Sequence, residues 1–369
     1  MQVQAIVQSE ITQEEVKTSV PTKFKDESSK PQYKWELIWR NIILYIIMHL
    51  TALYGLILVF VSAKVLTTVW TWFMLVVGLQ GITSGVHRLW THRSYKAKLP
   101  LRILLCIFQT IALQNHIYDW VTDHRVHHKY VDTDADPHNS KRGFFFCHMG
   151  WLFVKKHKDV IEKTKTIDLR DIEADPVVMF QKKYYHLVLA PLIGFLFPAW
   201  VPWYFWNENF VTSFFVATMF RYALTTNCTF LVNSVAHMYG TRPYDKNIRP
   251  TDNVPVTVIT GGEGWHNYHH TFPWDYKTGE LGNYTTNTST ALIDFMAKIG
   301  WAYDLKTVSE DMIMKRVNRT GDGTRKFDNH QVVDDHDHHH EGDNLWGWGD
   351  EDMKDEDLSY VKITHRKAE

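Results

Sequence analysis

Apolar residues along this chain gather into long blocks that are separated by charged stretches. The first block, residues 42–63, has 22 positions without a charge, and as an α-helix it is long enough to cross about 30 Å of hydrocarbon. Blocks of similar character cover residues 69–88, 185–206 and 210–232. The pattern predicts an all-α membrane protein with four transmembrane helices over these ranges. A shorter block at residues 101–113 predicts an interfacial or buried helix.

The positive charges between the blocks predict the orientation of these helices. The short connections around Lys64 and at residues 207–209 carry almost no positive charge, whereas the other flanks are rich in Lys and Arg. By the positive-inside rule, both termini and the large loops face the cytosol. The alternative, that some blocks are core helices of a soluble protein, is disfavoured by their length.

The two ends of the chain differ in composition from the part between them. Residues 1–34 are polar and lack the early apolar core of a cleavable signal peptide, so we predict a disordered cytosolic tail. Residues 321–369 are rich in Asp, His and Gly around a lone LWGWG motif, and we predict a second disordered tail. Residues 35–320 then form the folded domain, with a helical cap on the cytosolic side.

Composition narrows the classes of function. The net charge of −1 gives no indication of nucleic-acid binding. The 3 cysteines form no CxxC pair and two of them lie in apolar runs, so no disulfide framework is expected and the thiols are interpreted as packing residues. Histidine is the unusual residue, with 21 copies among 369 residues.

Many of these histidines lie in short motifs at the ends of the apolar blocks. HRVHH at 124–128 and HNYHH at 266–270 share one spacing, and HRLWTH at 87–92 places two histidines five apart. Positions i, i+3 and i+4 share a helix face, so each HxxHH motif is predicted to point three imidazoles at one spot. Five positions are about 140° around an α-helix, which favours His87 and His92 leaning toward two neighbouring metals.

The number of clustered histidines exceeds what one metal needs. His237 follows the fourth block, with Asn233 one turn before it, and brings the count to nine. One structural zinc takes four ligands, and a zinc protease needs the glutamate of HExxH, which is absent. Two redox metals at the membrane face would suit oxygen chemistry on an apolar substrate. HDHHH at 336–340 has the same spacing but lies among acidic residues and Gly, so we interpret it as a polar tract.

Carboxylates beside the motifs are candidates for orienting the imidazoles, or else are solvated loop charges. They are Asp123, Asp132, Asp134, Asp136 and Glu263. The histidines outside the motifs are interpreted as ordinary packing or surface residues: His49, His116, His138, His148, His157 and His186.

The motifs resemble those of a known family. HRLWTH at 87–92, DHRVHH at 123–128, NSVAH at 233–237 and GEGWHNYHHTFPWDY at 262–276 are similar, in the same order, to motifs of the membrane-bound acyl-CoA desaturases of the stearoyl-CoA desaturase type. The resemblance covers residues 35–326, and in its overall character the sequence resembles the insect members of the family.

The resemblance implies a site with two iron ions and a kinked acyl tunnel. Its metal ligands would be His87, His92, His124, His127, His128, His237, His266, His269 and His270, with Asn233 acting through a water. Coenzyme A contacts would be Asn41, Asp123, Lys155 and Lys156. The bend of the tunnel would be lined by Gln114, Trp120 and Thr229, and its floor by Leu75 and Leu79.

The resemblance also implies an activity. It is the O2-dependent insertion of one double bond into a long-chain fatty acyl-CoA, with Δ9 as the commonest position and others such as Δ11 as alternatives. The implied partners are acyl-CoA, cytochrome b5 as the electron donor and membrane lipid, at the endoplasmic reticulum.

Two other functions are compatible with parts of the pattern. A membrane di-iron lipid hydroxylase shares the histidine spacing, so only its product would distinguish it. A membrane metal transporter or buffer would carry ionisable residues near the middle of its spans. His49 and Arg221 are the main candidates for such residues, whereas the histidine motifs lie at span ends, which disfavours transport.

Overall fold

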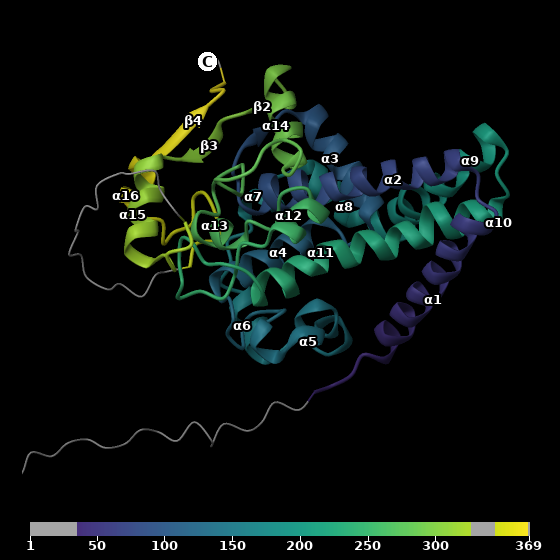
Figure 1. The fold of residues 1–369 in the computed structure, drawn as a ribbon, viewed down its shortest axis with the longest axis horizontal. Helices are drawn as coiled ribbons and strands as arrows, with labels where there is room; N and C mark the ends of the chain where they lie inside the picture. The colour runs from purple at the N-terminus through teal and green to yellow at the C-terminus, as the bar shows by residue number, and fades with distance from the viewer. Residues whose placement is uncertain (1–34, 326–343, 368–369) are drawn as a thin grey trace, which may run out of the picture. The chain divides into compact units, whose positions relative to one another are not determined.

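The computed structural model describes residues 35–325 and 344–367, and the regular secondary structure of these residues is almost entirely helical (Figure 1). Within the described ranges, strands form only two small antiparallel pairs. The pairs are β1 (Lys96–Ala97) with β2 (Ala302–Tyr303), and β3 (Leu305–Val308) with β4 (Val361–Thr364). The expectation of a helical membrane protein is therefore confirmed in its main feature.

Three helical segments of the described chain are long and apolar enough to cross a membrane. The first is α1 (Trp39–Val61), which is apolar on almost all sides. The second runs from α2 (Val65–Gln80) into the π-helix η2 (Gly81–Thr91). The third joins α8 (Pro176–Tyr184), η5 (Tyr185–Leu196) and α9 (Phe197–Trp206). Long apolar side chains are exposed along them, as in a surface that faces hydrocarbon.

The fourth expected span is helical but is not among these three. It consists of α10 (Phe210–Ser213), η6 (Phe214–Phe220) and α11 (Arg221–Met238). The segment packs against α1 and α2, and α2 and α11 run side by side in Figure 1. Its buried polar residues lower its hydropathy, so the count of four spans stays a prediction.

Arg221 shows how this helix is held. Its side chain is fully buried and donates hydrogen bonds to the carbonyl oxygens of Ile111 at 2.7 Å and Gly194 at 3.1 Å. Ile111 belongs to α3 (Leu99–Ala112), the helix expected at 101–113, which packs against α2 and η2. The guanidinium therefore ties the fourth helix to two others.

The remaining elements form a cap beside these helices. Its larger helices are α4 (Ile117–Lys129), α6 (Lys158–Thr164), α12 (Val254–Thr260), α13 (His266–Thr271), α14 (Thr288–Lys298) and α15 (Glu310–Thr320). The shorter ones are η3 (Ser140–Arg142), α5 (Phe144–His148), η4 (Gly150–Phe153), α7 (Arg170–Glu173) and α16 (Asp355–Ser359). One apolar cluster joins η2, α3, α4 and α14 through residues such as Val86, Leu105, Val121 and Ile293.

The helix that begins at Val65 changes its hydrogen-bond pattern at Gly81. From Gly81 to Thr91 its 11 residues form a π-helix, in which backbone bonds link residues five apart, and all of them are buried. Gly81 allows a close approach to α3, because a Cβ at this position would lie 2.1 Å from the backbone nitrogen of Gln109. This contact fixes η2 against α3.

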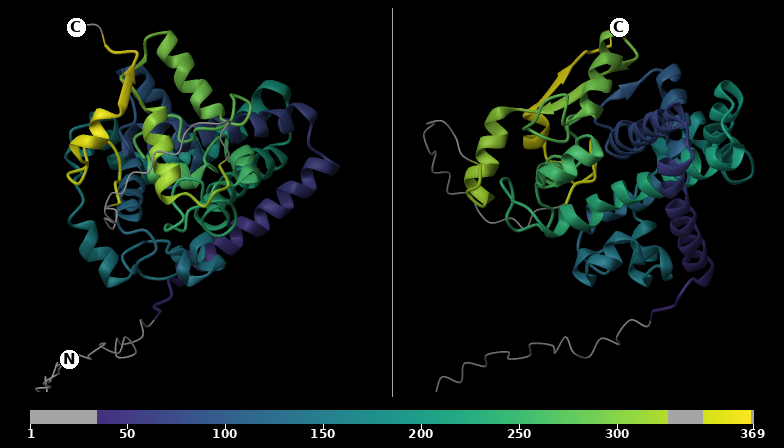
Figure 2. Two further views of the ribbon diagram at one scale, coloured as in Figure 1. Left: turned by 60° about the vertical axis from the view of Figure 1, so that its left-hand side comes forward. Right: turned by 45° about the vertical axis from the view of Figure 1, so that its right-hand side comes forward.

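The expectation of a disordered C-terminal tail is wrong for residues 344–367. These residues lie against the cap in both views of Figure 2, where they are yellow. β4 pairs with β3, and Trp346 is only 3% exposed. The overall composition of the tail did not reveal its two tryptophans as packing residues. Residues 1–34 and 326–343, including the HDHHH tract, lie outside the described part of the chain.

Candidate metal centre

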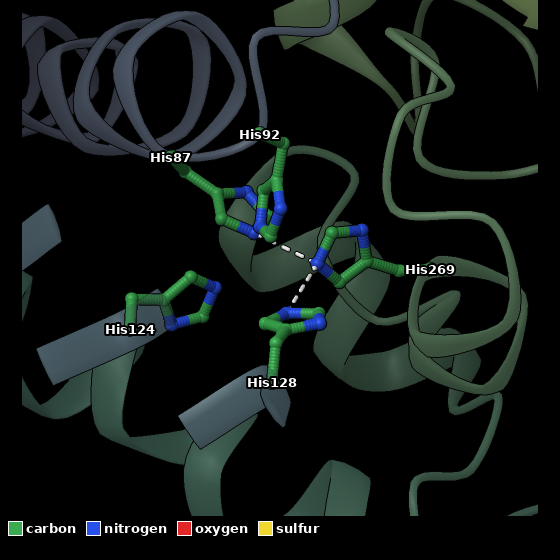
Figure 3. A group of neighbouring side chains, drawn as sticks. All are labelled: His87, His92, His124, His128 and His269. Carbon is green, nitrogen blue, oxygen red and sulfur yellow. Dashed lines mark hydrogen bonds between the residues drawn. The ribbon is translucent and has the colours of Figure 1, made fainter. Parts of the chain in front are cut away.

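The nine motif histidines converge on two neighbouring groups, and within each group the candidate ligand atoms lie within 4.8 Å of one another. The five-histidine group, drawn in Figure 3, consists of His87, His92, His124, His128 and His269. The four-histidine group consists of His127, His237, His266 and His270.

The π-helix η2 decides where its two histidines point. The backbone nitrogen of His92 donates to the carbonyl oxygen of His87 at 3.1 Å, and the two ring centres are 4.7 Å apart. The expectation that they lean toward different metals is wrong, because it assumed α-helical geometry. A turn closed between residues five apart places His87 and His92 on one face, and both enter the five-histidine group.

Each HxxHH motif divides its histidines between the two groups. The i and i+4 residues belong to one group and the i+3 residue to the other. On α4, His124 and His128 join the five-histidine group and His127 joins the four-histidine group. On α13, His266 and His270 join the four-histidine group and His269 joins the five-histidine group. The expectation of three imidazoles at one spot is therefore wrong. Adjacent residues on an α-helix are about 100° apart, so positions i+3 and i+4 address two sites. Both helices thus contribute to both groups.

In the five-histidine group, ring nitrogens face one another at the spacing of metal ligands. The Nε2 atom of His269 lies 3.0 Å from Nε2 of His87 and 3.1 Å from Nε2 of His128 (Figure 3). In a neutral imidazole, Nε2 carries either one proton or one lone pair. The Nε2 atom of His269 can therefore make one good hydrogen bond, but not two, to these neighbours. A shared metal with nitrogen ligands at about 2.1 Å explains this arrangement better than hydrogen bonding.

The four-histidine group has the same character. The Nε2 atom of His266 lies 3.0 Å from Nε2 of His237 and 3.1 Å from Nε2 of His270. Among the described residues, the buried Nε2 atoms of His92 and His124 in the first group have no hydrogen-bond partner. Buried polar atoms without a partner are costly, and a metal ion would supply one.

Burial keeps these imidazoles in the form that binds metals. Desolvation, together with repulsion between neighbouring histidines, lowers the pKa of five histidines on α4 and α13 well below the usual 6.5. They are His124, His128, His266, His269 and His270. Neutral imidazole is the ligating form, so the site is prepared for a cation.

We expect the metal-free protein to lose stability as the pH falls below 6.5. Because these pKa values are lower in the folded state, the unfolded chain binds more protons below its own pKa of 6.5. Each extra proton bound by the unfolded chain lowers the free energy of unfolding by about 1.4 kcal/mol for every pH unit by which the pH falls. Thermal unfolding in detergent, followed by tryptophan fluorescence between about pH 7.5 and about pH 5.5, measures this effect. An unchanged unfolding temperature would contradict it.

Buried carboxylates hold the outer nitrogens of two of the histidines. His87 Nδ1 lies 2.8 Å from Glu263 Oε2, and His127 Nδ1 lies 2.9 Å from Asp136 Oδ1. Glu263 also accepts from Arg88 Nη2 at 2.7 Å. Burial alone would raise the pKa of Glu263, but Arg88 and His87 outweigh it and lower that pKa to about 2. Such carboxylates orient the rings and raise their basicity as ligands.

The other three candidate carboxylates have partners outside the histidine groups. Asp123 pairs with Lys156, Asp132 accepts from Ser140, and Asp134 pairs with Arg142. Of the five carboxylates beside the motifs, only Glu263 and Asp136 contact motif histidines through hydrogen bonds or ion pairs within the described chain.

His138 was interpreted as an ordinary residue, but it lies beside the four-histidine group. Its ring centre is 4.2 Å from that of His127, and its Nδ1 atom is 3.7 Å from Asp136 Oδ1. Burial and the neighbouring His127 lower the pKa of His138 to about 3. The sequence did contain a sign of this placement, because His138 follows Asp136 by two residues in a turn that comes directly after a histidine motif.

Comparison with known proteins agrees with this geometry. Residues 64–281 match the family model described as fatty acid desaturase. The chain belongs to the fatty acid desaturase family. It is 66% identical to an acyl-CoA Delta-12 desaturase of Tribolium castaneum over 95% of this chain and 99% of the relative. It is 56% identical to an acyl-CoA Delta-9 desaturase of Acheta domesticus over 93% and 91%, and 53% identical to a stearoyl-CoA desaturase of Bos taurus over 83% and 84%.

The protein is thus an acyl-CoA desaturase and an oxidoreductase, and the resemblance seen in its motifs is confirmed. Enzymes of this family use iron. The two buried histidine groups fit that metal, since imidazole nitrogen is a suitable ligand for it. The hydroxylase and transporter alternatives have no support among these relatives.

A cavity of about 470 Å³ in the desaturase reaches the histidine groups, since His87, His124 and His266 form part of its wall. The cavity is also lined by eight of the other residues implied by the resemblance: Asn41, Leu79, Gln114, Trp120, Asp123, Lys156, Thr229 and Asn233. Lys155 and Leu75 do not line it in the described structure. Lys155 pairs with Glu36, and Leu75 packs behind Leu79.

Hydrogen bonds organise part of the cavity wall. Gln114 Nε2 donates to Thr229 Oγ1 at 2.8 Å, which joins the end of α3 to α11. Asn41 Nδ2 donates to the carbonyl oxygen of Leu152 at 2.8 Å, which joins α1 to the cap. Polar groups are therefore placed at defined points along a largely apolar cavity, as in a site for a long amphipathic ligand.

Proposed function

We propose that this desaturase inserts one double bond into a long-chain fatty acyl-CoA, using O2 and two iron ions, with electrons delivered by cytochrome b5. The observation that carries the proposal is the convergence of nine histidines on two groups at the wall of one cavity. The five-histidine group would hold one ion and the four-histidine group the other. Asn233, which lines the same cavity, would act through a water.

The protein supplies position and the exclusion of water. Bound iron would activate O2, and O2 would supply the oxidising power for removing two hydrogens from an unactivated carbon chain. Asn41 and the Asp123–Lys156 pair would hold the polar head, with Lys155 beside them at the surface and Lys156 facing a phosphate. Apolar residues such as Leu79, with Leu75 behind it, would enclose the acyl chain.

The position of the double bond depends on geometry. The distance from the anchored head to the histidine groups determines which carbons lie beside them, and the Gln114–Thr229 bond, with Trp120, would shape the bend. The names of related desaturases give Delta-12, Delta-9 and Delta-11. We propose Δ9, with Δ11 and Δ12 as the alternatives, and the product decides among them.

The proposal places the enzyme in the endoplasmic reticulum membrane with both termini in the cytosol. The helix from Phe210 to Met238 would be the fourth span, since it packs against two candidate spans and ends at the histidine groups. The short connections around Lys64 and at 207–209 would then lie on the lumenal side.

Expression in a desaturase-deficient yeast tests the function. We expect a new unsaturated fatty acid, located by derivatisation of its double bond, when saturated or Δ9-monounsaturated substrate is supplied. His266→Ala removes a nitrogen that faces both His237 and His270, so product should fall to background while the protein is still made. His186→Ala, an imidazole outside both groups, should keep its activity. A hydroxylated lipid, or full activity of His266→Ala, would refute the proposal.

A further inference from the structure

A short C-terminal segment contacts the five-histidine group from behind. We name residues 344–348 the C-terminal strap. His92 Nδ1 donates a hydrogen bond to the carbonyl oxygen of Trp346, 254 positions away in the chain. In return, the backbone nitrogen of Trp348 donates to the carbonyl oxygen of His92 at 2.9 Å. The strap is therefore bonded to His92 through both its ring and its backbone.

The Trp346 ring contacts two cations. The guanidinium of Arg93 lies 4.7 Å and that of Arg125 lies 4.1 Å from the ring centre. Arg125 also donates to the carbonyl oxygens of Trp90 at 2.7 Å and Thr91 at 3.1 Å. The ring is thus fastened to the same stretch of backbone that carries His92, and cation–π contacts of this kind are stronger when buried.

Asp350 anchors the strap to a second helix. Its Oδ2 atom accepts from the backbone nitrogen of Trp346 at 2.9 Å, and its Oδ1 atom accepts from Lys129 Nζ at 2.8 Å. Asp350 is buried, and Lys129 directly follows His128. The strap consequently links the ends of η2 and α4, and each of these helices carries histidines of the five-histidine group.

We propose that the C-terminal strap is a positioning element of the metal centre, an inference that rests on the proposed function. A ring that donates from Nδ1 presents Nε2 as its lone-pair nitrogen. The Nε2 atom of His92 is buried without a hydrogen-bond partner in the described chain, so it is the nitrogen available to a metal. The Trp346 carbonyl fixes this tautomer and the ring's direction, as Glu263 does for His87.

Two neighbouring glycines provide a matched test. Gly347 has a φ of +155°, and a Cβ there would lie 2.6 Å from the carbonyl oxygen of His92. Gly347→Ala should therefore push the strap away from His92. Gly349 also has a positive φ, of +80°, but its Cβ would meet only the flexible end of Arg93, at 3.2 Å. Gly349→Ala likewise places a side chain at a positive φ, but without the clash with the backbone of His92.

The full-length enzyme, stripped of metal in detergent, would be titrated with ⁵⁷Fe²⁺ against a chelator and examined by Mössbauer spectroscopy. We expect Gly347→Ala to bind one of its two ions about 10- to 100-fold more weakly, with a changed signal for that ion alone. Gly349→Ala should match the wild type. If Gly347→Ala unfolds, Asp350→Asn replaces it, with a smaller effect in the same direction.

The outcomes separate the two proposals. If Gly347→Ala, or Asp350→Asn in its place, shows wild-type iron binding and spectra, the positioning role is overturned and the proposed function is left intact. An equal loss of both ions in Gly347→Ala and Gly349→Ala would also overturn it, because it would show general destabilisation. Failure of the wild-type enzyme to bind two ions would instead contradict the proposed function.

Discussion

Replacing Glu263 with glutamine is expected to destabilise the desaturase by about 3–5 kcal/mol, the usual effect of removing one partner from a buried ion pair. Arg88 is fully buried and donates to Glu263 from both Nε and Nη2. Glutamine keeps the shape but presents an amide N–H₂ to either Arg88 or His87 Nδ1, and both are donors. His87 would lose the group that orients it, so metal affinity should fall about 10- to 100-fold.

Thermal unfolding in detergent and iron content per chain measure these two losses. Glu162→Gln is the control, because Glu162 pairs with Lys165 at the surface, where the side chains are 67% and 65% exposed. An exposed pair of this kind contributes about 0–1 kcal/mol. Equal behaviour of the two variants would show that the buried carboxylate does not support the site.

Replacing Gly81 with alanine is expected to displace η2 from α3 and to remove most activity. The added Cβ would lie 2.1 Å from the backbone nitrogen of Gln109 and 2.3 Å from the carbonyl carbon of Phe108. Backbone atoms cannot move aside as a side chain can, so the cost should exceed the ~1–3 kcal/mol typical of overpacking. Because η2 carries His87 and His92, iron content should fall with stability.

Gly78→Ala is the matched control, one turn earlier on the same helix and facing the same neighbour. Its Cβ would meet Ala112 at 3.4–3.6 Å, which is ordinary contact. We expect wild-type expression, unfolding temperature and iron content for this variant. A tolerated Gly81→Ala would show that η2 and α3 can separate without disturbing the histidines.

The nine histidines that form the candidate metal centre could be predicted from the sequence, because local spacing and apolar surroundings distinguish their motifs from chance. The division of these histidines between the two groups could not be predicted, since it depends on two features that the periodicity of the sequence does not reveal. The turn between His87 and His92 is π-helical rather than α-helical. Each HxxHH helix also lies between two sites, so its i+3 histidine addresses the second one.

Contacts between distant segments explain the other differences. His138 gains its place through Asp136 and His127 in the folded turn. Trp346 lies in a segment whose average composition is polar and acidic, and its packing partners, Arg93 and Arg125, are far away in the sequence. The composition of a segment describes that segment alone, whereas its folding also depends on the surfaces that distant parts of the chain present to it.

The buried Arg221 also bears on how the chain enters the membrane during synthesis. Segments are released into lipid according to their own hydrophobicity, and an arginine near the helix centre opposes release by about 2.5–3.5 kcal/mol. The carbonyl oxygens that receive this guanidinium, on Ile111 and Gly194, belong to segments made earlier. In the proposed four-span topology, the segment from Phe210 to Met238 should therefore enter the membrane together with the third span, so that Arg221 meets protein already in place rather than lipid.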